Sequence, residues 1–384
     1  MTYRVAIIGT GEDPETRDRD GYAMAYRHAS GYQRLDSCSL VACADIVPEN
    51  AEAFAEHHGL DDDAVYEDHE TMLEEAEPDI VSICVPPAIH AGLVVDSASA
   101  RSVDAVHCEK PMATAWDDCK RMVEVCDRED VQLTIDHQRR VAEPVLRAKE
   151  LLDDGEIGEL ERVEWSEVNL FDAGSHLFDL CDLFVDGARA EWALAAIDCS
   201  HENRWFGSLN ETRSIAQWQY ADGTMGVAST AEDGVTTVDA YLRLVGEDGT
   251  IEIQADDGTA LRVRTDGKWR TVDTDESVYG PTPGIARAAL SKATGFLPGV
   301  TWPTDPPTHY EKAIEHLVDA LSTETEPVFS GRRVLRGTEL VFASWESARR
   351  RGRVHLPLDV EGNPLEEMYD AGQLGGMDDW PDSA

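Results

Sequence analysis

Short apolar runs alternate with helix-like segments along the first 137 residues, and this alternation constrains the fold more than any other feature of the chain. The apolar runs are Arg4–Ile8, Ser39–Ala44, Asp79–Val85, Val103–Cys108 and Val131–Ile135. The segments that follow a helical pattern are Tyr22–Ala29, Glu49–His58, His69–Ala76, Ile89–Ala100 and Ala115–Arg128. Strands that are apolar along their length and separated by helices are typical of a parallel, doubly wound sheet. We therefore predict an α/β domain of the Rossmann type over residues 1–137.

The pattern changes after Asp136. Helices are predicted at Glu143–Leu152 and near 174–185, with a strand between them, and again at Tyr310–Leu321 and Val334–Arg350. From Trp192 to Val272, strand-like runs are separated by the turn pairs Asp222-Gly223, Asp248-Gly249, Asp257-Gly258 and Asp266-Gly267. Asp-Gly pairs between such runs indicate tight hairpins. We expect an α+β domain with an open, mainly antiparallel sheet over residues 138–360. The remaining residues, 361–384, are expected to form an acidic, flexible tail.

The charge balance of the chain excludes two classes of binding partner. The chain has 33 basic and 76 acidic residues, for a formal net charge of −43, and the acidic residues are spread over its whole length. Such a balance repels phosphate backbones and anionic lipid, so nucleic-acid and membrane partners are excluded. High salt screens the self-repulsion of an acidic surface, so the composition favours a protein of a high-salt cell.

The cysteines indicate a reducing compartment. The chain has eight cysteines with no CxxC pair, and several lie inside apolar strand-like runs. We interpret them as reduced core residues, which argues against a structural zinc site, and we expect no metal. The first apolar run is too short for a signal peptide, and no run approaches the roughly 20 residues that span a bilayer. The sequence therefore predicts a soluble, cytoplasmic protein.

A glycine pair at the end of the first apolar run suggests a dinucleotide site. Gly9-Thr10-Gly11 lies where such a fold needs a tight turn and a close approach of the backbone to pyrophosphate. The third glycine of the GxGxxG pattern is replaced by Pro14, so we interpret residues 12–20 as an inserted loop, with Gly21 opening the helix. Asp45 ends the second apolar run, where the ribose-binding acid is expected, and predicts NAD rather than NADP. Arg17 or Arg19 in the loop could reverse that preference.

The most specific motif follows the fourth strand of the alternation. The run Cys108-Glu109-Lys110-Pro111 places a lysine at the carboxyl end of a strand, in a chain with only six lysines. Ligands bind at this edge of an open α/β sheet. Pro86 and His90 follow the preceding strand and are candidates for the same crevice, although a plain turn and a helix-surface histidine would fit the pattern as well.

These motifs resemble the glucose–fructose oxidoreductase/inositol dehydrogenase (Gfo/Idh/MocA) family, whose members carry Glu-Lys-Pro at this place. Further resemblance lies in the segments 135–140, 155–158 and 347–349. The resemblance implies a cis Lys110-Pro111 bond and a nicotinamide cofactor. The residues expected to contact that cofactor are Gly9, Thr10, Gly11, Asp45, Pro86, His90, Glu109 and Lys110.

A second constellation lies in the run from Asp172 to Asp179. If this run is helical, Asp172, His176 and Asp179 fall on one polar stripe at i, i+4 and i+7. The spacing of Asp172 and His176 matches the family's D-x-x-x-H motif, which implies that Lys110, Asp172 and His176 are catalytic. His176 is the expected general base, and Lys110 is expected to stabilise the reacting oxygen. Asp172 would orient the substrate and support the charged His176, and His137 and Arg139 could line the substrate side.

The family resemblance implies an oxidoreductase that moves a hydride between a secondary alcohol of a sugar or cyclic polyol and NAD. Two alternatives stay open: an NAD-dependent glycosidase of the same fold, and a sugar-sensing regulator without turnover. Only about ten residues separate the strand at residues 162–165 from Asp172. A loop that covers the substrate is therefore missing or comes from another subunit. We expect a homodimer or homotetramer formed through the C-terminal sheet.

Overall fold

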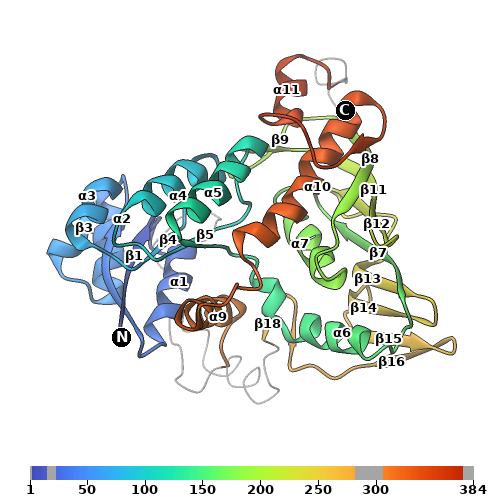
Figure 1. Cartoon of the computed structure of the whole chain (residues 1–384), viewed down its shortest axis with the longest axis horizontal. Coiled ribbons are helices and arrows are strands. Elements are labelled where there is room, and N and C mark those ends of the chain that lie inside the picture. The colour runs from blue at the N-terminus through green and yellow to red at the C-terminus, as the bar shows by residue number, and fades with distance from the viewer. Residues whose placement is uncertain (1, 15–22, 282–305, 375–384) are drawn as a thin grey trace, which may run out of the picture.

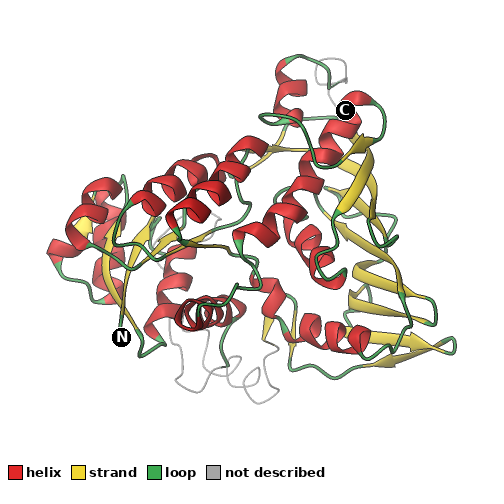
Figure 2. Ribbon diagram, in the orientation of Figure 1, coloured by secondary structure: helices red, strands yellow, loops and turns green. Residues whose placement is uncertain are grey.

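The computed structural model describes residues 2–14, 23–281 and 306–374 (Figure 1). The expectations that concern Gly21, Arg17 and Arg19 lie outside the described residues. Two sheets organise the chain, one in the N-terminal part and one in the C-terminal part (Figure 2). No helix within the residues that the structure describes is long and apolar enough to cross a bilayer.

The N-terminal sheet is parallel throughout, in the order β3-β2-β1-β4-β5-β6. Its strands are β1 (Tyr3–Ile8), β2 (Cys38–Ala44), β3 (Val65–Tyr66), β4 (Ile80–Ile83), β5 (Ala105–Cys108) and β6 (Gln132–Ile135). The helices between them are α1 (Met24–Gln33), α2 (Pro48–His58), α3 (His69–Ala76), α4 (His90–Ser99) and α5 (Trp116–Glu129). The strand order reverses between β1 and β4, as in a dinucleotide-binding fold. The predicted doubly wound sheet is confirmed, and the one strand that the sequence analysis missed is the two-residue β3.

The C-terminal sheet has nine strands in the order β16-β15-β14-β13-β7-β12-β11-β8-β19. They are β7 (Leu160–Glu167), β8 (Ala190–Asp198), β11 (Arg213–Tyr220), β12 (Met225–Ala231), β13 (Ala240–Gly246), β14 (Gly249–Ala255), β15 (Leu261–Thr265), β16 (Lys268–Thr271) and β19 (Val354–His355). Every neighbouring pair is antiparallel except β7 with β12. The predicted mainly antiparallel sheet is confirmed. The sequence analysis did not predict that β7 lies between β13 and β12, in the middle of this sheet.

Helices cover one face of this second sheet and leave the other open (Figure 1). They are α6 (Glu143–Asp153), α7 (Ser175–Phe184) and α10 (Gly331–Arg350), while α9 (His309–Thr323) packs against α1. Residues of β11 alternate between the faces, so Ala216 and Trp218 are buried whereas Ile215 is 56% exposed. Trp218 stacks with Phe178 of α7. On this covered face α7 lies between the two sheets (Figure 1).

Part of the segment expected to be a flexible tail is instead an ordered helix. Residues Pro364–Asp370 form α11, which Asn363 caps by accepting hydrogen bonds from the backbone N–H groups of Leu365 and Glu366. Leu365 and Met368 are buried, and α11 packs against α10. The expectation of a flexible tail does not hold for Pro364–Asp370, because buried apolar contacts hold this helix despite its polar composition.

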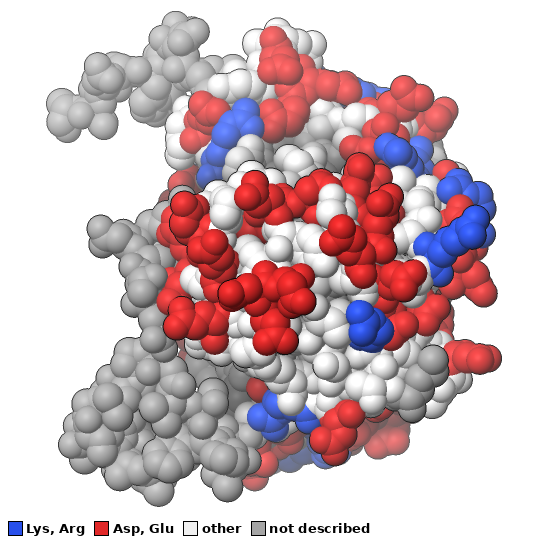
Figure 3. Space-filling model, turned by 90° about the vertical axis from the view of Figure 1, so that its left-hand side faces the viewer, with Lys and Arg blue, Asp and Glu red and all other residues white. Residues whose placement is uncertain are grey.

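Acidic side chains dominate the end of the molecule formed by α2 and α3, where Figure 3 shows many Asp and Glu and few Lys or Arg. Residues 61–63, which join these two helices, are three consecutive exposed aspartates. The acidic side chains exposed on this face lie far from the C-terminal tail, which agrees with the interpretation of the negative charge as solvating the surface.

Candidate active site

The turn after β1 is built as the glycine pair predicts. Gly9 and Gly11 have φ values of +84° and +65°, which favour glycine. A Cβ on Gly9 would lie 2.3 Å from Cγ1 of Val85, so the close approach to the end of β4 also requires glycine. A Cβ on Gly11 would meet nothing within 4 Å among the described residues. The turn has the shape that a pyrophosphate needs.

Asp45 is tied to this turn. One of its oxygens, Oδ2, accepts hydrogen bonds from the backbone N–H of Gly11 at 2.9 Å and from the Thr10 hydroxyl at 3.1 Å. Oδ1 accepts from the backbone N–H of Val47 at 2.9 Å. A carboxylate can accept about four hydrogen bonds, and these three contacts leave one position of Asp45 for a ribose hydroxyl. A second position becomes free if the Thr10 hydroxyl turns away. Thr10 is itself buried and supports the turn through its side chain.

The two candidates after β4 differ in position. Pro86 is exposed and precedes the short 3-10 helix Pro87–Ile89. His90 is fully buried, with Nδ1 at 2.9 Å from the carbonyl oxygen of Pro111 and Nε2 at 2.8 Å from that of Val85. The prediction that His90 contacts the cofactor is not supported by this position. Its ring instead joins the end of β4 to the loop after β5.

Lys110 follows β5, and the Lys110-Pro111 bond is cis, as the resemblance implied. Its ammonium group donates to the backbone oxygen of Asp172 at 3.1 Å and to Oδ1 of the same residue at 3.2 Å. The neighbouring Glu109 turns inward, where its Oε1 lies 3.0 Å from Nε2 of His28. The Lys110–Asp172 pair therefore joins the N-terminal sheet to the segment that precedes α7.

The expected polar stripe of Asp172, His176 and Asp179 does not form, because the helix begins only at Ser175. Asp172 lies in the preceding turn, where Asn169 accepts a hydrogen bond from Ala173 N–H at 2.9 Å through Oδ1. A Cβ on Gly174 would lie 2.6 Å from the carbonyl oxygen of Asn169, so this tight turn requires glycine. Within the described residues, no hydrogen bond or ion pair joins Asp172 to His176. Asp172 faces Lys110 instead.

A buried carboxylate that the sequence analysis missed holds this turn. Glu211 accepts hydrogen bonds from Leu170 N–H at 2.7 Å, from the Thr230 hydroxyl at 3.1 Å and from the indole N–H of Trp345 at 3.1 Å. It is completely buried, and burial raises its pKa. No local pattern marks this residue, because its three partners come from three separate segments of the chain.

His176 lies in the first turn of α7 and is 2% exposed. Its ring is 5.0 Å from that of His137, edge to face, and its Nδ1 has no hydrogen-bond partner in the part of the chain that the structure describes. Burial, followed by the positive charges of Arg139 and Lys110, lowers the pKa of His176 well below its usual value. Burial lowers the pKa of His137 to about 4. Both rings are therefore neutral at ordinary pH and can accept a proton.

Arg139 forms a further wall beside these histidines. Its guanidinium donates to the Tyr241 hydroxyl, and it stacks over the rings of Tyr241 and Tyr279 at 5.2 Å and 5.4 Å from their centroids. Glu167 lies 3.9 Å from the same guanidinium. The tyrosines were not predicted, because they come from β13 and from the loop after β17 (Glu276–Ser277).

The next residue, Arg140, faces the opposite way. It is 1% exposed and makes a bidentate pair with Asp179 at 2.6 Å and 2.9 Å, with a third bond to Asp182 at 3.0 Å. Both aspartates lie on α7. This pair fixes the helix that carries His176 to the segment that carries His137 and Arg139, and it explains why Asp179 does not face the site.

Comparison with known proteins shows the family of the chain. Residues 3–137 match a family described as "Oxidoreductase family, NAD-binding Rossmann fold", and residues 161–356 match its "C-terminal alpha/beta domain". The chain belongs to the Gfo/Idh/MocA oxidoreductase family. The residues described above at the turn after β1 fit the nicotinamide cofactor that such a family uses.

Several known proteins are similar to this chain. A D-apiose dehydrogenase of Paraburkholderia graminis is 25% identical over 377 residues, which cover 92% of this chain and 90% of that protein. A D-xylose 1-dehydrogenase [NADP(+)] of Haloarcula marismortui is 35% identical over 109 residues, covering 28% and 30%. Among solved structures, an oxidoreductase of Agrobacterium radiobacter in complex with NAD+, L-tartaric acid and magnesium has a TM-score of 0.71 at 20% identity, covering 92% of this chain and 98% of that one.

Proposed function

We propose that this protein is a nicotinamide-dependent dehydrogenase that oxidises a secondary alcohol of a sugar or cyclic polyol. The observation that carries the proposal is the pairing of Lys110, from the N-terminal sheet, with Asp172, in the turn that leads into the first turn of α7 and its His176. The sugar dehydrogenases among its relatives support the substrate class. The nicotinamide supplies hydride acceptance when it is bound.

The roles of the residues follow from their surroundings. His176 is a neutral base in a buried setting, so its imidazole can take the hydroxyl proton of the substrate. The Lys110 ammonium carries a fixed positive charge that can stabilise the oxygen as that proton leaves. Asp172 holds the ammonium at 3.2 Å and so limits the positions that it can take. This role replaces the support of His176 that the sequence analysis expected.

Arg139 is proposed to orient the substrate. Its two tyrosine neighbours and Glu167 restrict its side chain, which is 17% exposed. A guanidinium fixed in this way offers donors in a rigid plane to hydroxyl or carboxylate oxygens. Neither ring nitrogen of His137 has a hydrogen-bond partner in the described residues. The ring can therefore donate a hydrogen bond to the substrate or accept one from it on the same side.

Asp45 supports a preference for NAD. Its carboxylate lies beside the turn where the ribose of the cofactor would bind, and its negative charge would repel a 2′-phosphate. Because one relative is NADP-dependent, the preference between NAD and NADP has to be measured.

We also propose that copies of the chain associate through the open face of the C-terminal sheet, where Leu194 and Ile215 are 40% and 56% exposed.

The proposal is tested with a panel of sugars, inositols and glycosides, with NAD or NADP, in molar salt, while the absorbance of the reduced nicotinamide is followed. We expect at least one free sugar or polyol to give one reduced cofactor per product. Cleavage of a glycoside without net reduction would favour the NAD-dependent glycosidase. Tight cofactor binding without turnover of any compound would favour the sugar-sensing regulator.

A further inference from the structure

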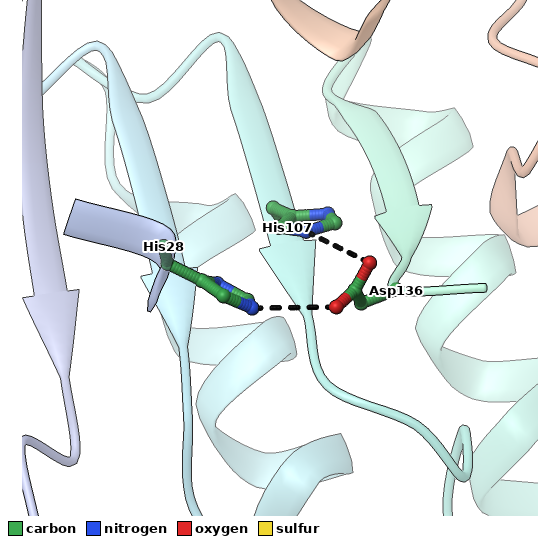
Figure 4. A group of neighbouring side chains, drawn as sticks. All are labelled: His28, His107 and Asp136. Carbon is green, nitrogen blue, oxygen red and sulfur yellow. Dashed lines mark ion pairs between the residues drawn. The ribbon is translucent and has the colours of Figure 1, made fainter. Parts of the chain in front are cut away.

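A cluster of buried titratable side chains lies inside the N-terminal sheet domain, apart from the candidate active site. It consists of His28 on α1, His107 on β5 and Asp136 just after β6, drawn in Figure 4. The three side chains are at most 1% exposed. One nitrogen of each histidine and one carboxylate oxygen of Asp136 all lie within 4.8 Å of one another. Buried ionisable groups are unfavourable unless they are paired, so a cluster this close together and this deeply buried needs an explanation.

The hydrogen bonds of His107 fix where its proton lies. The Thr134 hydroxyl is 3.3 Å from the backbone oxygen of Val106, to which it donates, and so it accepts from Nδ1 of His107 at 2.8 Å. The proton of the neutral ring is therefore on Nδ1, and Nε2 presents a lone pair. That lone pair faces Oδ1 of Asp136 at 3.8 Å, and neither atom has a hydrogen-bond partner in the described part of the chain. Two buried acceptors facing each other call for a cation between them.

His28 also has a hydroxyl at Nδ1, that of Ser82 at 2.8 Å, with the Cys84 sulfur at 3.4 Å. Unlike that of His107, its Nε2 is hydrogen-bonded, to Oε1 of Glu109 at 3.0 Å, and it lies 3.5 Å from Oδ2 of Asp136. Histidines that bind metals usually direct their other ring nitrogen at a fixed oxygen, which sets the ring orientation. Both histidines of the cluster have such a hydroxyl at Nδ1. Both point Nε2 at the carboxylates.

The distances and charges fit a divalent ion. Four ligands at the 2.0–2.1 Å of a zinc site stand about 3.3 Å apart at the corners of a tetrahedron. The separations of 3.5 and 3.8 Å between the Nε2 atoms of His28 and His107 and the oxygens of Asp136 lie around that value. Glu109 and Asp136 are two buried negative charges, and a proton on His28 would neutralise only one of them. A divalent ion with two neutral histidines neutralises both.

We propose that His28, His107 and Asp136 bind one divalent transition-metal ion, with the negative charge of Glu109 beside His28. The set of two imidazoles and one carboxylate suits Zn²⁺ and its cobalt substitute. The three ligands are buried and come from separate elements, so the role of the site is structural: it ties α1 to β5 and to the end of β6. The proposal goes beyond the dehydrogenase function and does not depend on it.

The first experiment uses the full-length wild-type protein and metal alone. Protein is stripped with a chelator, dialysed and titrated with Co²⁺, and its visible absorption is recorded; Zn²⁺ bound after dialysis is counted by elemental analysis. We expect one Zn²⁺ per chain and the intense d–d bands of tetrahedral cobalt. X-ray absorption of the zinc-loaded protein should show nitrogen and oxygen ligands with the scattering of two imidazoles. No metal uptake, or sulfur among the ligands, would overturn the proposal.

Variants then locate the ion. His107→Gln and Asp136→Asn should each abolish the cobalt bands, while His69→Ala should keep them. His69 is the matched control, because it belongs to a second but exposed group with Glu70 and Asp96. Cobalt bands of wild-type strength in Asp136→Asn would contradict the assignment. If either variant fails to fold, the wild-type absorption and ligand spectra still decide the question.

Discussion

The pair formed by Arg140 and Asp179 gives the sharpest quantitative prediction. Arg140→Met removes the guanidinium and keeps most of the volume of the side chain. Asp182 then keeps Arg336, whose guanidinium lies at 2.6 Å and 3.0 Å, whereas Asp179 loses both side-chain bonds from Arg140. Because both partners are 1% exposed, water cannot replace these bonds.

The expected cost follows from leaving one buried carboxylate without its partner. Removing one member of a buried pair costs about 3–5 kcal/mol of the free energy of unfolding, which changes the unfolding equilibrium constant by roughly 10²–10⁴. Denaturant titration at fixed salt, followed by tryptophan fluorescence, measures this change. The probe is suitable because Trp165 on β7, Trp218 on β11 and Trp345 on α10 are buried in and beside the sheet that α7 covers.

Two further variants separate the buried pair from a general effect of lost charge. Arg147→Met removes an exposed arginine that pairs with Glu150 on α6, and it should cost less than about 0.5 kcal/mol. Arg140→Met combined with Asp179→Leu removes both buried charges and should recover most of the lost stability. A single Arg140→Met variant within about 1 kcal/mol of the wild type would refute this account of how α7 is held.

Three other predictions concern the cofactor, pH and salt. Asp45→Ser should raise the ratio of kcat/KM for NADP to that for NAD about tenfold or more, because it removes a charge that repels the 2′-phosphate by roughly 1–4 kcal/mol; an unchanged ratio would show that Asp45 does not select the cofactor. The lowered pKa keeps His176 neutral in the folded state, so kcat/KM should not fall as pH drops from 7.5 to 6.5. An unfolded histidine binds a proton below about 6.5, so the free energy of unfolding should decrease as pH falls through 6.5. A His176-dependent loss of activity centred above pH 6.5 would contradict this. Thermal melts should rise from low salt to molar potassium chloride because of the net charge of −43, and flat melts would reject that reasoning.

Much of the fold could be predicted because its signals are local. The apolar runs and the turn glycines determine strands and hairpins within a few residues of each other, so the alternation of the first 137 residues was enough to predict the parallel sheet. Lys110 was found for the same reason, as a lysine directly at a strand end. The C-terminal helix α11 was missed because its stability comes from Leu365 and Met368 packing against distant elements.

The errors at the candidate site have a common physical origin in contacts between segments that are distant in the sequence. The register of the helical stripe assumed a helix from Asp172, whereas Asn169 and Glu211 hold a turn there until Ser175. Such long-range hydrogen bonds leave no spacing pattern. The expectation of no metal rested on cysteine usage alone, and the contact between the rings of His28 and His107 could not be read from residues so far apart in the sequence.

The central claim is that Lys110 and His176, from different parts of the chain, act on one reacting oxygen. The most direct measurement compares kcat with the dissociation constant of the cofactor for His176→Ala, Lys110→Ala and the double variant, with an active substrate. We predict that each single change lowers kcat by about 10²–10⁴-fold while cofactor binding survives. The two losses should be less than additive, because both groups serve one step. A His176→Ala protein that melts at a lower temperature but keeps wild-type kcat would contradict the claim.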